Sequence, residues 1–294
     1  MSVATITEAL ASDRASVSFE FFPPKDDAGE TALWKTITEL SDISPSFVSV
    51  TYGAGGSDRD RTAALSARIA QETDILPMGH LTCVGQTRAQ LTEVIGQYHF
   101  GGVRNILALR GDPKAGAGAR WESHPGGLSH AIDLIELIKD LHPEIAIGVA
   151  AFPKGHPESP SLEFDSQVIA DKVAAGAEFA ITQFFYRLNE YTELVNRVRD
   201  KGAEIPIVPG IMPIESLRQV QRMAELSRTE VPREIVERIA AGGEDREMVR
   251  KIGIEIAAEL SQELLDAGAP GLHFYTLNKS RATREVFAQL RLNR

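Results

Sequence analysis

The sequence has a single cysteine, no long apolar run and no recognisable targeting segment. Because Cys83 stands alone among 294 residues, an internal disulfide is excluded and a reducing compartment is indicated. The longest apolar stretch, residues 145–152, is far too short to span a bilayer. The first residues lack the basic segment and apolar segment of a signal peptide. These absences predict a cytoplasmic protein.

The sequence also has fewer basic residues than acidic ones. The chain carries 31 Lys and Arg against 41 Asp and Glu, a net charge of −10, which argues against nucleic acid or an anionic membrane as the partner. The seven histidines form no H-x-H or H-E-x-x-H pattern, so we expect no metal site. His99 and His142 are expected at helix ends, on the surface or as capping residues. "GAGG" at 53–56 lacks the G-x-G-x-x-G spacing of a dinucleotide-binding loop.

Short strand-like segments recur along the chain, and most of them precede a helical pattern. They lie at residues 17–21, 47–52, 77–83, 104–109, 146–151, 179–184, 206–211 and 272–275. Several are almost continuously apolar, as expected of parallel strands that are buried on both faces. Eight such strands alternating with helices predict an α/β fold, a (βα)8 TIM-type barrel.

The pattern predicts one barrel domain over residues 1–294, because no linker separates two compositional halves. Residues 1–14 are expected to form an N-terminal arm or a short helix. Residues 128–141 have apolar side chains at helical spacing. Residues 214–267, before the last strand, are long enough for about three extra helices.

Polar side chains stand at the predicted carboxyl ends of the strands, where a barrel builds its active site. Among them, Glu20 lies within "SFEFFPPK" at 18–25, just before two prolines that end the strand. On these eight residues alone, the favoured interpretation is that Glu20 is an ion-paired structural residue, or that it points to solvent while the aromatic side chains point inward. Desolvation among Phe19, Phe21 and Phe22 would instead favour the protonated form that a proton donor needs. Because polar groups recur at strand after strand, we favour the functional interpretation.

Eight motifs occur in one order from about Val17 to the C-terminus. They are "FEFFPPK", "FVSVTYGAGG", "HLTC", "ALRGDP", "HPES", "ITQFFY", "PGIMPI" and "FYTLN". Together they resemble the methylenetetrahydrofolate reductase family. The resemblance implies a barrel with non-covalent FAD, NADH or NADPH as hydride donor, and reduction of 5,10-methylenetetrahydrofolate to 5-methyltetrahydrofolate. It also implies a role in one-carbon metabolism and methionine biosynthesis, a small-molecule folate substrate and a homo-oligomer.

The resemblance also assigns roles to individual residues. Glu20 matches the general acid that protonates N10 of the folate, and Asp112 matches an aspartate near the flavin and the pterin. The matched cofactor-binding positions are Thr51, Tyr52, Ala54, His80, Arg110, Gly111, Asp112, His130, Ala131, Phe152, His156, Asp165 and Lys172. The matched substrate-binding positions are Glu20, Asp112, Gln183, Gln219, Met223 and Lys279.

At six positions the chain departs from the common bacterial pattern. His130 and Phe152 stand where tyrosines are common, Val168 and Asp171 where polar or basic residues are, Met223 where an aromatic is, and Lys279 where an arginine is. Two alternatives therefore stay open: a flavin-free or reverse-running methyltetrahydrofolate oxidoreductase, and a non-catalytic folate-binding protein. The presence of Glu20 speaks against the second, because a pure binder needs no proton donor.

Overall fold

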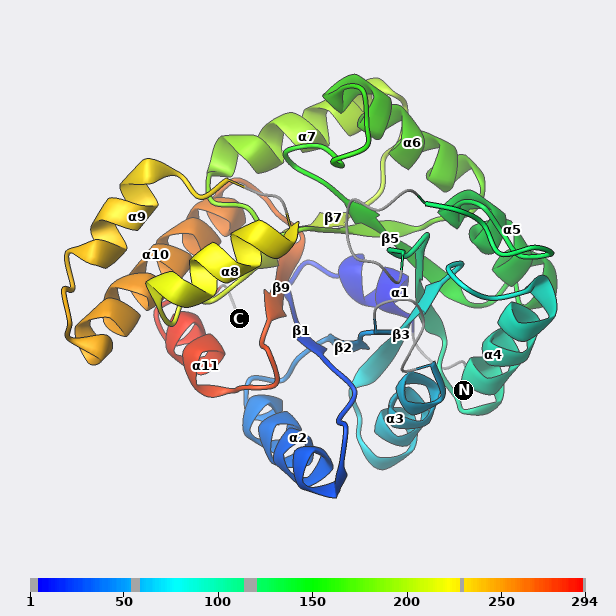
Figure 1. Ribbon diagram of the computed structural model, residues 1–294, viewed down its shortest axis with the longest axis horizontal. Coiled ribbons are helices and arrows are strands. Elements are labelled where there is room, and N and C mark those ends of the chain that lie inside the picture. Colours follow the sequence, from blue (N-terminus) through cyan, green and yellow to red (C-terminus); the bar gives the residue numbers. More distant parts are fainter. Residues whose placement is uncertain (1–4, 54–58, 114–120, 228–229, 293–294) are drawn as a thin grey trace.

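The computed structural model describes residues 5–53, 59–113, 121–227 and 230–292, and it shows a ring of helices around a parallel sheet (Figure 1). The strands are β1 Ser16–Phe21, β2 Phe47–Val50, β3 Leu76–Thr82, β4 Asn105–Leu109, β5 Ala146–Ala151, β6 Phe179–Thr182, β7 Ile207–Val208, β8 Gly210–Ile211 and β9 Gly271–Tyr275. Their order in the sheet is β7-β6-β5-β4-β3-β2-β1-β9-β8, and every pair is parallel. All eight predicted strand segments are thus present.

The seventh predicted strand is divided in two by Pro209. Because proline has no N–H to donate, the ladder is interrupted there. The residues before it pair with β6, and those after it pair with β9. The carbonyl of Pro209 accepts a hydrogen bond from the His273 N–H at 3.0 Å. The two short strands join the ends of the sheet, which closes into the predicted TIM-type barrel.

The helices cover the outside of this barrel. They are α2 Asp27–Ser41, α3 Arg59–Glu72, α4 Arg88–Phe100, α5 Ala131–Leu141, α6 Leu162–Ala174, α7 Leu188–Asp200, α8 Leu217–Ser227, α9 Arg233–Ala240, α10 Arg246–Asp266 and α11 Arg281–Phe287. The region between β8 and β9 holds α8, α9 and α10, as the sequence predicted, and they project from one side of the ring (Figure 1). None of the helices in the described segments is long and apolar enough to cross a membrane.

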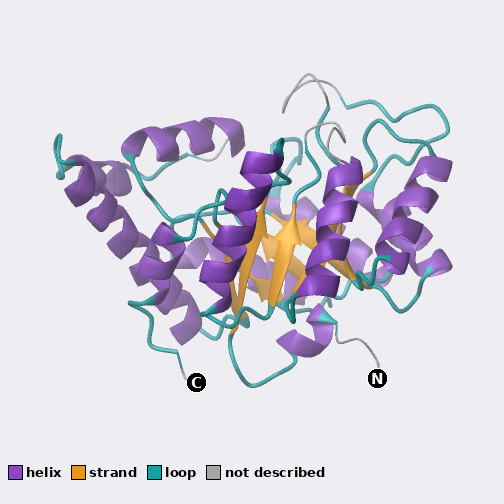
Figure 2. Cartoon of the chain, turned by 90° about the horizontal axis from the view of Figure 1, so that it is seen from below, coloured by secondary structure: helices purple, strands orange, loops and turns teal. Residues whose placement is uncertain are grey.

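A short helix, α1 Ile6–Leu10, closes the end of the barrel where the strands begin. It is next to the N-terminus, below the strands, in Figure 2. Its first N–H, that of Ile6, donates to Oδ1 of Asn105 at 2.7 Å. Ile6 and Leu10 are buried in one cluster with apolar residues that face the barrel interior, such as Phe47 and Met78. The opposite end, where the strands finish, is therefore the end left for a site.

Candidate active site

Glu20 lies inside the barrel near the carboxyl end of β1, and its side chain is only 13% exposed. Its Oε2 is 3.6 Å from Nε2 of His80, which comes from β3, and 3.9 Å from Nε2 of His273, which comes from β9. The hydroxyl of Thr276 donates to the Glu20 carbonyl at 2.6 Å and fixes the backbone there. A carboxyl group is thus held among two imidazoles in a confined space.

The prediction that aromatic side chains surround the carboxyl group of Glu20 was wrong. Successive side chains of a strand point to opposite faces. Phe19 and Phe21 therefore point away from Glu20, into the apolar core between the sheet and the surrounding helices. Phe22 is 42% exposed. The polar environment of Glu20 comes instead from strands far away in the sequence.

His273 is a residue of this site that the sequence analysis missed. Its Nδ1 is 2.8 Å from the hydroxyl of Ser18, and its Nε2 is 3.4 Å from that of Ser49. In the sheet it pairs with Ser18, two residues before Glu20 on the same face of β1. The signal available in the sequence was the two-residue alternation, which places His273 on the same face as Tyr275.

Burial sets the protonation state of the groups around Glu20. It lowers the pKa of His80 to about 4, because the charged imidazolium is desolvated; the carboxylate of Glu20 opposes this shift and His273 adds to it. His80 is therefore neutral near pH 7. Burial, and secondarily the charge of Glu20, raises the pKa of Tyr275 well above its ordinary value. Tyr275 donates its hydroxyl proton to the Thr182 carbonyl at 2.6 Å, so it links β9 to β6.

A group of basic side chains, Arg110, His156 and Lys172, lies beyond the carboxyl ends of β4 and β5. Nη1 of Arg110 is 2.6 Å from the Glu158 carboxylate, and its guanidinium lies over the ring of Trp121. Burial lowers the pKa of Lys172 to about 8; Asp165 opposes this and Arg110 adds to it. The pKa of His156 is also lowered, first by burial and then by Arg110. Arg110 and the buried Lys172 are thus suited to binding an anion, and a neutral His156 can donate a hydrogen bond to it.

Asp165 organises the loop that carries His156. Its carboxylate accepts hydrogen bonds from the His156 N–H and the Ser159 hydroxyl. Phe152 packs edge-on against the His156 ring, with centroids 5.0 Å apart. The structure thus brings together three matched residues: Phe152 and His156, in the loop after β5, and Asp165, on α6.

Gly111, at the end of β4, approaches the neighbouring strand end closely. Its φ is +84°, and an added Cβ would lie 2.7 Å from Cγ1 of Val84 and 2.9 Å from Cβ of Thr82. Asp112, the next residue, is exposed. Glycine here allows the chain to turn and leaves Asp112 at the rim of the barrel.

Three buried polar atoms at the ends of β2 and β3 have no hydrogen-bond partner within the described segments. They are Oγ1 of Thr51, Nε2 of His80 and Oγ1 of Thr82. The neighbouring Tyr52 hydroxyl is instead satisfied by Oε1 of Gln86 at 3.3 Å. Since buried polar groups are ordinarily paired, such a set is typical of a ligand-binding surface.

The other matched residues lie around this rim. His130 caps the N-terminus of α5 and stacks on Trp121, and Ala131 is the buried first residue of that helix. Gln183 follows β6, and its Oε1 accepts the N–H of Phe184 at 3.0 Å. Ala54 falls outside the described residues.

Three further matched residues sit on or near α8. Gln219 binds its own loop, because Oε1 accepts the Glu215 N–H at 2.7 Å and Nε2 donates to the Pro213 carbonyl at 3.1 Å. Nζ of Lys279 is 2.9 Å from the Glu215 carboxylate. Met223 packs against an apolar cluster that covers this side of the barrel.

A closed parallel barrel with titratable side chains inside the carboxyl ends of its strands defines a (βα)8-barrel enzyme. The family model described as methylenetetrahydrofolate reductase matches residues 5–291. The 5,10-methylenetetrahydrofolate reductase of Pectobacterium carotovorum subsp. carotovorum is 38% identical, over 93% of this chain and 89% of its own. That of Escherichia coli (strain K12) is 36% identical, over 92% and 89%. The chain therefore belongs to the methylenetetrahydrofolate reductase family, a family of oxidoreductases.

A solved structure shares the fold at much lower identity. It is described as an uncharacterized protein from Clostridium thermocellum that binds two copies of 5-methyl-5,6,7,8-tetrahydrofolic acid. The TM-score is 0.64 at 14% identity, over 97% of both chains. This similarity supports the barrel fold.

Proposed function

We propose that the protein reduces 5,10-methylenetetrahydrofolate to 5-methyltetrahydrofolate, with NADH or NADPH as the hydride source and FAD as the bound cofactor. The observation that carries the proposal is the position of Glu20. In a chain of this family, it is a carboxyl group inside the barrel that is only 13% exposed, beside His80 and His273.

The rim of the barrel has the groups that an FAD molecule would need. Arg110, His156 and Lys172 would hold the diphosphate or ribityl part. Gly111 would let the ligand come close to the backbone. The unpartnered Oγ1 of Thr51 and Nε2 of His80 would bind polar edges of the flavin. When bound, the flavin supplies hydride transfer between the nicotinamide and the folate.

Glu20 would donate the proton that opens the folate's methylene bridge. N10 is a poor leaving group until it is protonated, and its protonation breaks the bond from N10 to the bridging carbon and leaves an iminium at N5. The iminium carbon then accepts the hydride and becomes the methyl group. His80, kept neutral by burial, puts no positive charge beside Glu20.

The remaining matched residues would position the folate. The amide of Gln183 offers a donor and an acceptor, which suits the edge of a pterin. Asp112 would influence the flavin and the pterin through its charge. Gln219 and Lys279 shape the loop after β8, through Pro213 and Glu215.

The flavin absorbance of the purified protein tests this function. We expect a yellow protein that bleaches when NADH or NADPH is added without oxygen. Its colour should return when methylenetetrahydrofolate follows, with one methyltetrahydrofolate formed per flavin. A colourless protein that still reduces the folate would contradict the flavin and support direct transfer from nicotinamide. Folate binding without any turnover would leave only a binding protein.

A further inference from the structure

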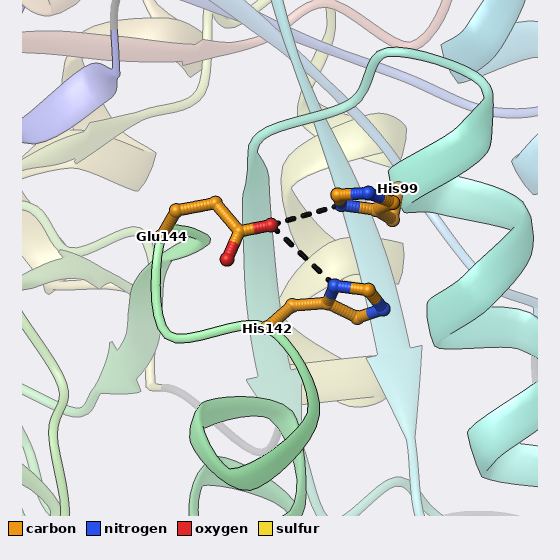
Figure 3. A group of neighbouring side chains, drawn as sticks. All are labelled: His99, His142 and Glu144. Atoms are coloured by element: carbon orange, nitrogen blue, oxygen red, sulfur yellow. Dashed lines mark ion pairs between the residues drawn. The ribbon is translucent and has the colours of Figure 1, made fainter.

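Three potential metal ligands meet at the end of the barrel where the strands begin, opposite the end that holds Glu20. His99 lies in the last turn of α4, His142 caps the C-terminus of α5, and Glu144 lies in the turn before β5 (Figure 3). Nδ1 of His99 is 2.9 Å from Oε1 of Glu144, and Nδ1 of His142 is 3.4 Å from the same oxygen. The three ligand atoms all lie within 4.8 Å of one another.

We propose that His99, His142 and Glu144 bind a divalent transition-metal ion, with Zn²⁺ as the best fit. Two imidazole nitrogens and one carboxylate oxygen form a common three-residue set for zinc, which leaves a fourth position for water. Bonds of about 2.1 Å in a tetrahedron place neighbouring ligand atoms about 3.4 Å apart. The two distances to Oε1 are close to that spacing. Because the two rings are nearly parallel, one of them must turn so that both Nδ1 lone pairs point at the ion.

The local electrostatics favour a cation between these side chains. Two helices, α4 and α5, end here, and helix C-termini carry partial negative charge. Glu144 adds its carboxylate oxygen beside the two Nδ1 atoms.

One of the two imidazoles lacks a satisfactory partner. Nδ1 of His99 is buried and makes no hydrogen bond of good geometry in the described part of the chain, although the Glu144 oxygen is near. The two rings stack with centroids 3.9 Å apart and direct both Nδ1 atoms toward that oxygen (Figure 3). With one ring turned out of the stack, a single ion would bind both nitrogens.

Two positively charged side chains, Arg104 and Lys139, lie near the three proposed ligands, and both make hydrogen bonds to other groups. Nη1 of Arg104 donates to the His99 carbonyl at 2.7 Å. Nζ of Lys139 donates to the Ile145 carbonyl at 2.8 Å and lies 2.7 Å from the Glu178 carboxylate. Neither takes a ligand atom of the proposed site. The Glu144 side chain is 47% exposed, which leaves a path for the ion and its water.

The motif search did not find this site because its ligands come from two segments. His142 and Glu144 are two residues apart, but His99 is supplied by the preceding helix through the packing of α4 beside α5. The expectation of no metal site rested on local spacing alone.

Cobalt titration of the chelator-treated protein tests the proposal, because Co²⁺ in a tetrahedral zinc site absorbs visible light. We expect one Co²⁺ bound per chain, displaced by one equivalent of Zn²⁺. The variants His142→Gln and Glu144→Gln should weaken binding by at least about 100-fold, since each removes one of three ligands. His124→Gln, which changes an exposed histidine outside the cluster, is the matched control.

A thermal unfolding series gives a second readout. Zn²⁺ at 100 times its dissociation constant should raise the midpoint for the unmodified protein and the control, but not for either ligand variant. Failure of the unmodified protein to bind Co²⁺ or Zn²⁺ would overturn the proposal. Binding that survives in both ligand variants would overturn it as well.

Discussion

Glu20 differs from an ordinary strand carboxylate because of what faces it. One neighbour, His80, is kept neutral by burial, and the other, His273, is held by two serine hydroxyls. Neither forms a close ion pair with the carboxyl group, since the distances are 3.6 and 3.9 Å. The carboxyl group is thus confined without being locked into a salt bridge, which suits a group that must give up a proton.

The lowered pKa of His80 makes a prediction about stability. In the unfolded chain this histidine takes up a proton near pH 6.5, but in the folded protein it does so only near pH 4. Between these values the unfolded state binds the extra proton, so His80 makes the protein less stable as the pH falls through this window. A pKa shift of this size corresponds to about 3 kcal/mol in the free energy of unfolding.

Urea unfolding of the flavin-free protein at pH 7 and pH 4.5 measures this effect. On going from pH 7 to pH 4.5, we expect the free energy of unfolding to fall by about 2–3 kcal/mol less in His80→Gln than in the unmodified protein. The control His124→Gln should behave like the unmodified protein. An equal loss in all three proteins would show that His80 is protonated normally in the fold.

At the scale of the element, the turn that follows β4 depends on Gly111. This glycine combines a left-handed backbone with a close approach to Val84 and Thr82, and it precedes Asp112 at the rim. Gly126, later in the same connection, also has a positive φ, +73°, but an added Cβ would meet nothing within 4 Å. Comparing alanine substitutions at Gly111 and Gly126 therefore separates the cost of a left-handed backbone from the cost of steric crowding.

We expect Gly126→Ala to cost about 1–2 kcal/mol of unfolding free energy, the ordinary cost of a left-handed alanine. Gly111→Ala should cost about 1–3 kcal/mol more, because the new methyl group also collides with packed side chains. Urea unfolding of both variants measures the difference. Equal costs would mean that the neighbours of Gly111 move aside freely.

At the scale of the whole molecule, the sequence predicted the barrel but not the way in which it closes. Runs of apolar residues identified the strands, because parallel strands buried on both faces need them. The split at Pro209 depends on pairing with both β6 and β9, which are distant in sequence. Local pattern carries no information about such partners.

For the candidate site, too, the sequence indicated some of the residues but not the contacts between them. Glu20, His80 and Gln183 were singled out because they stand at predicted strand ends within recognisable motifs, and the structure brings them to one end of the barrel. His273 and the orientation of Phe19 and Phe21 were not found, because they depend on the alternation of side chains and the register between strands. The meeting of His99 with His142 depends on helix packing, which no short motif encodes.

In the proposed function, Glu20 supplies a proton to the folate and has no part in reduction of the flavin. Glu20→Gln keeps the shape of the side chain and can donate a hydrogen bond, but it cannot release a proton. Rapid mixing measures the two half-reactions separately. We predict that reduction of the flavin by NADH or NADPH stays nearly unchanged, and that reoxidation by methylenetetrahydrofolate slows by ~10²–10⁴-fold. Equal slowing of both steps, or no slowing of either, would contradict the account.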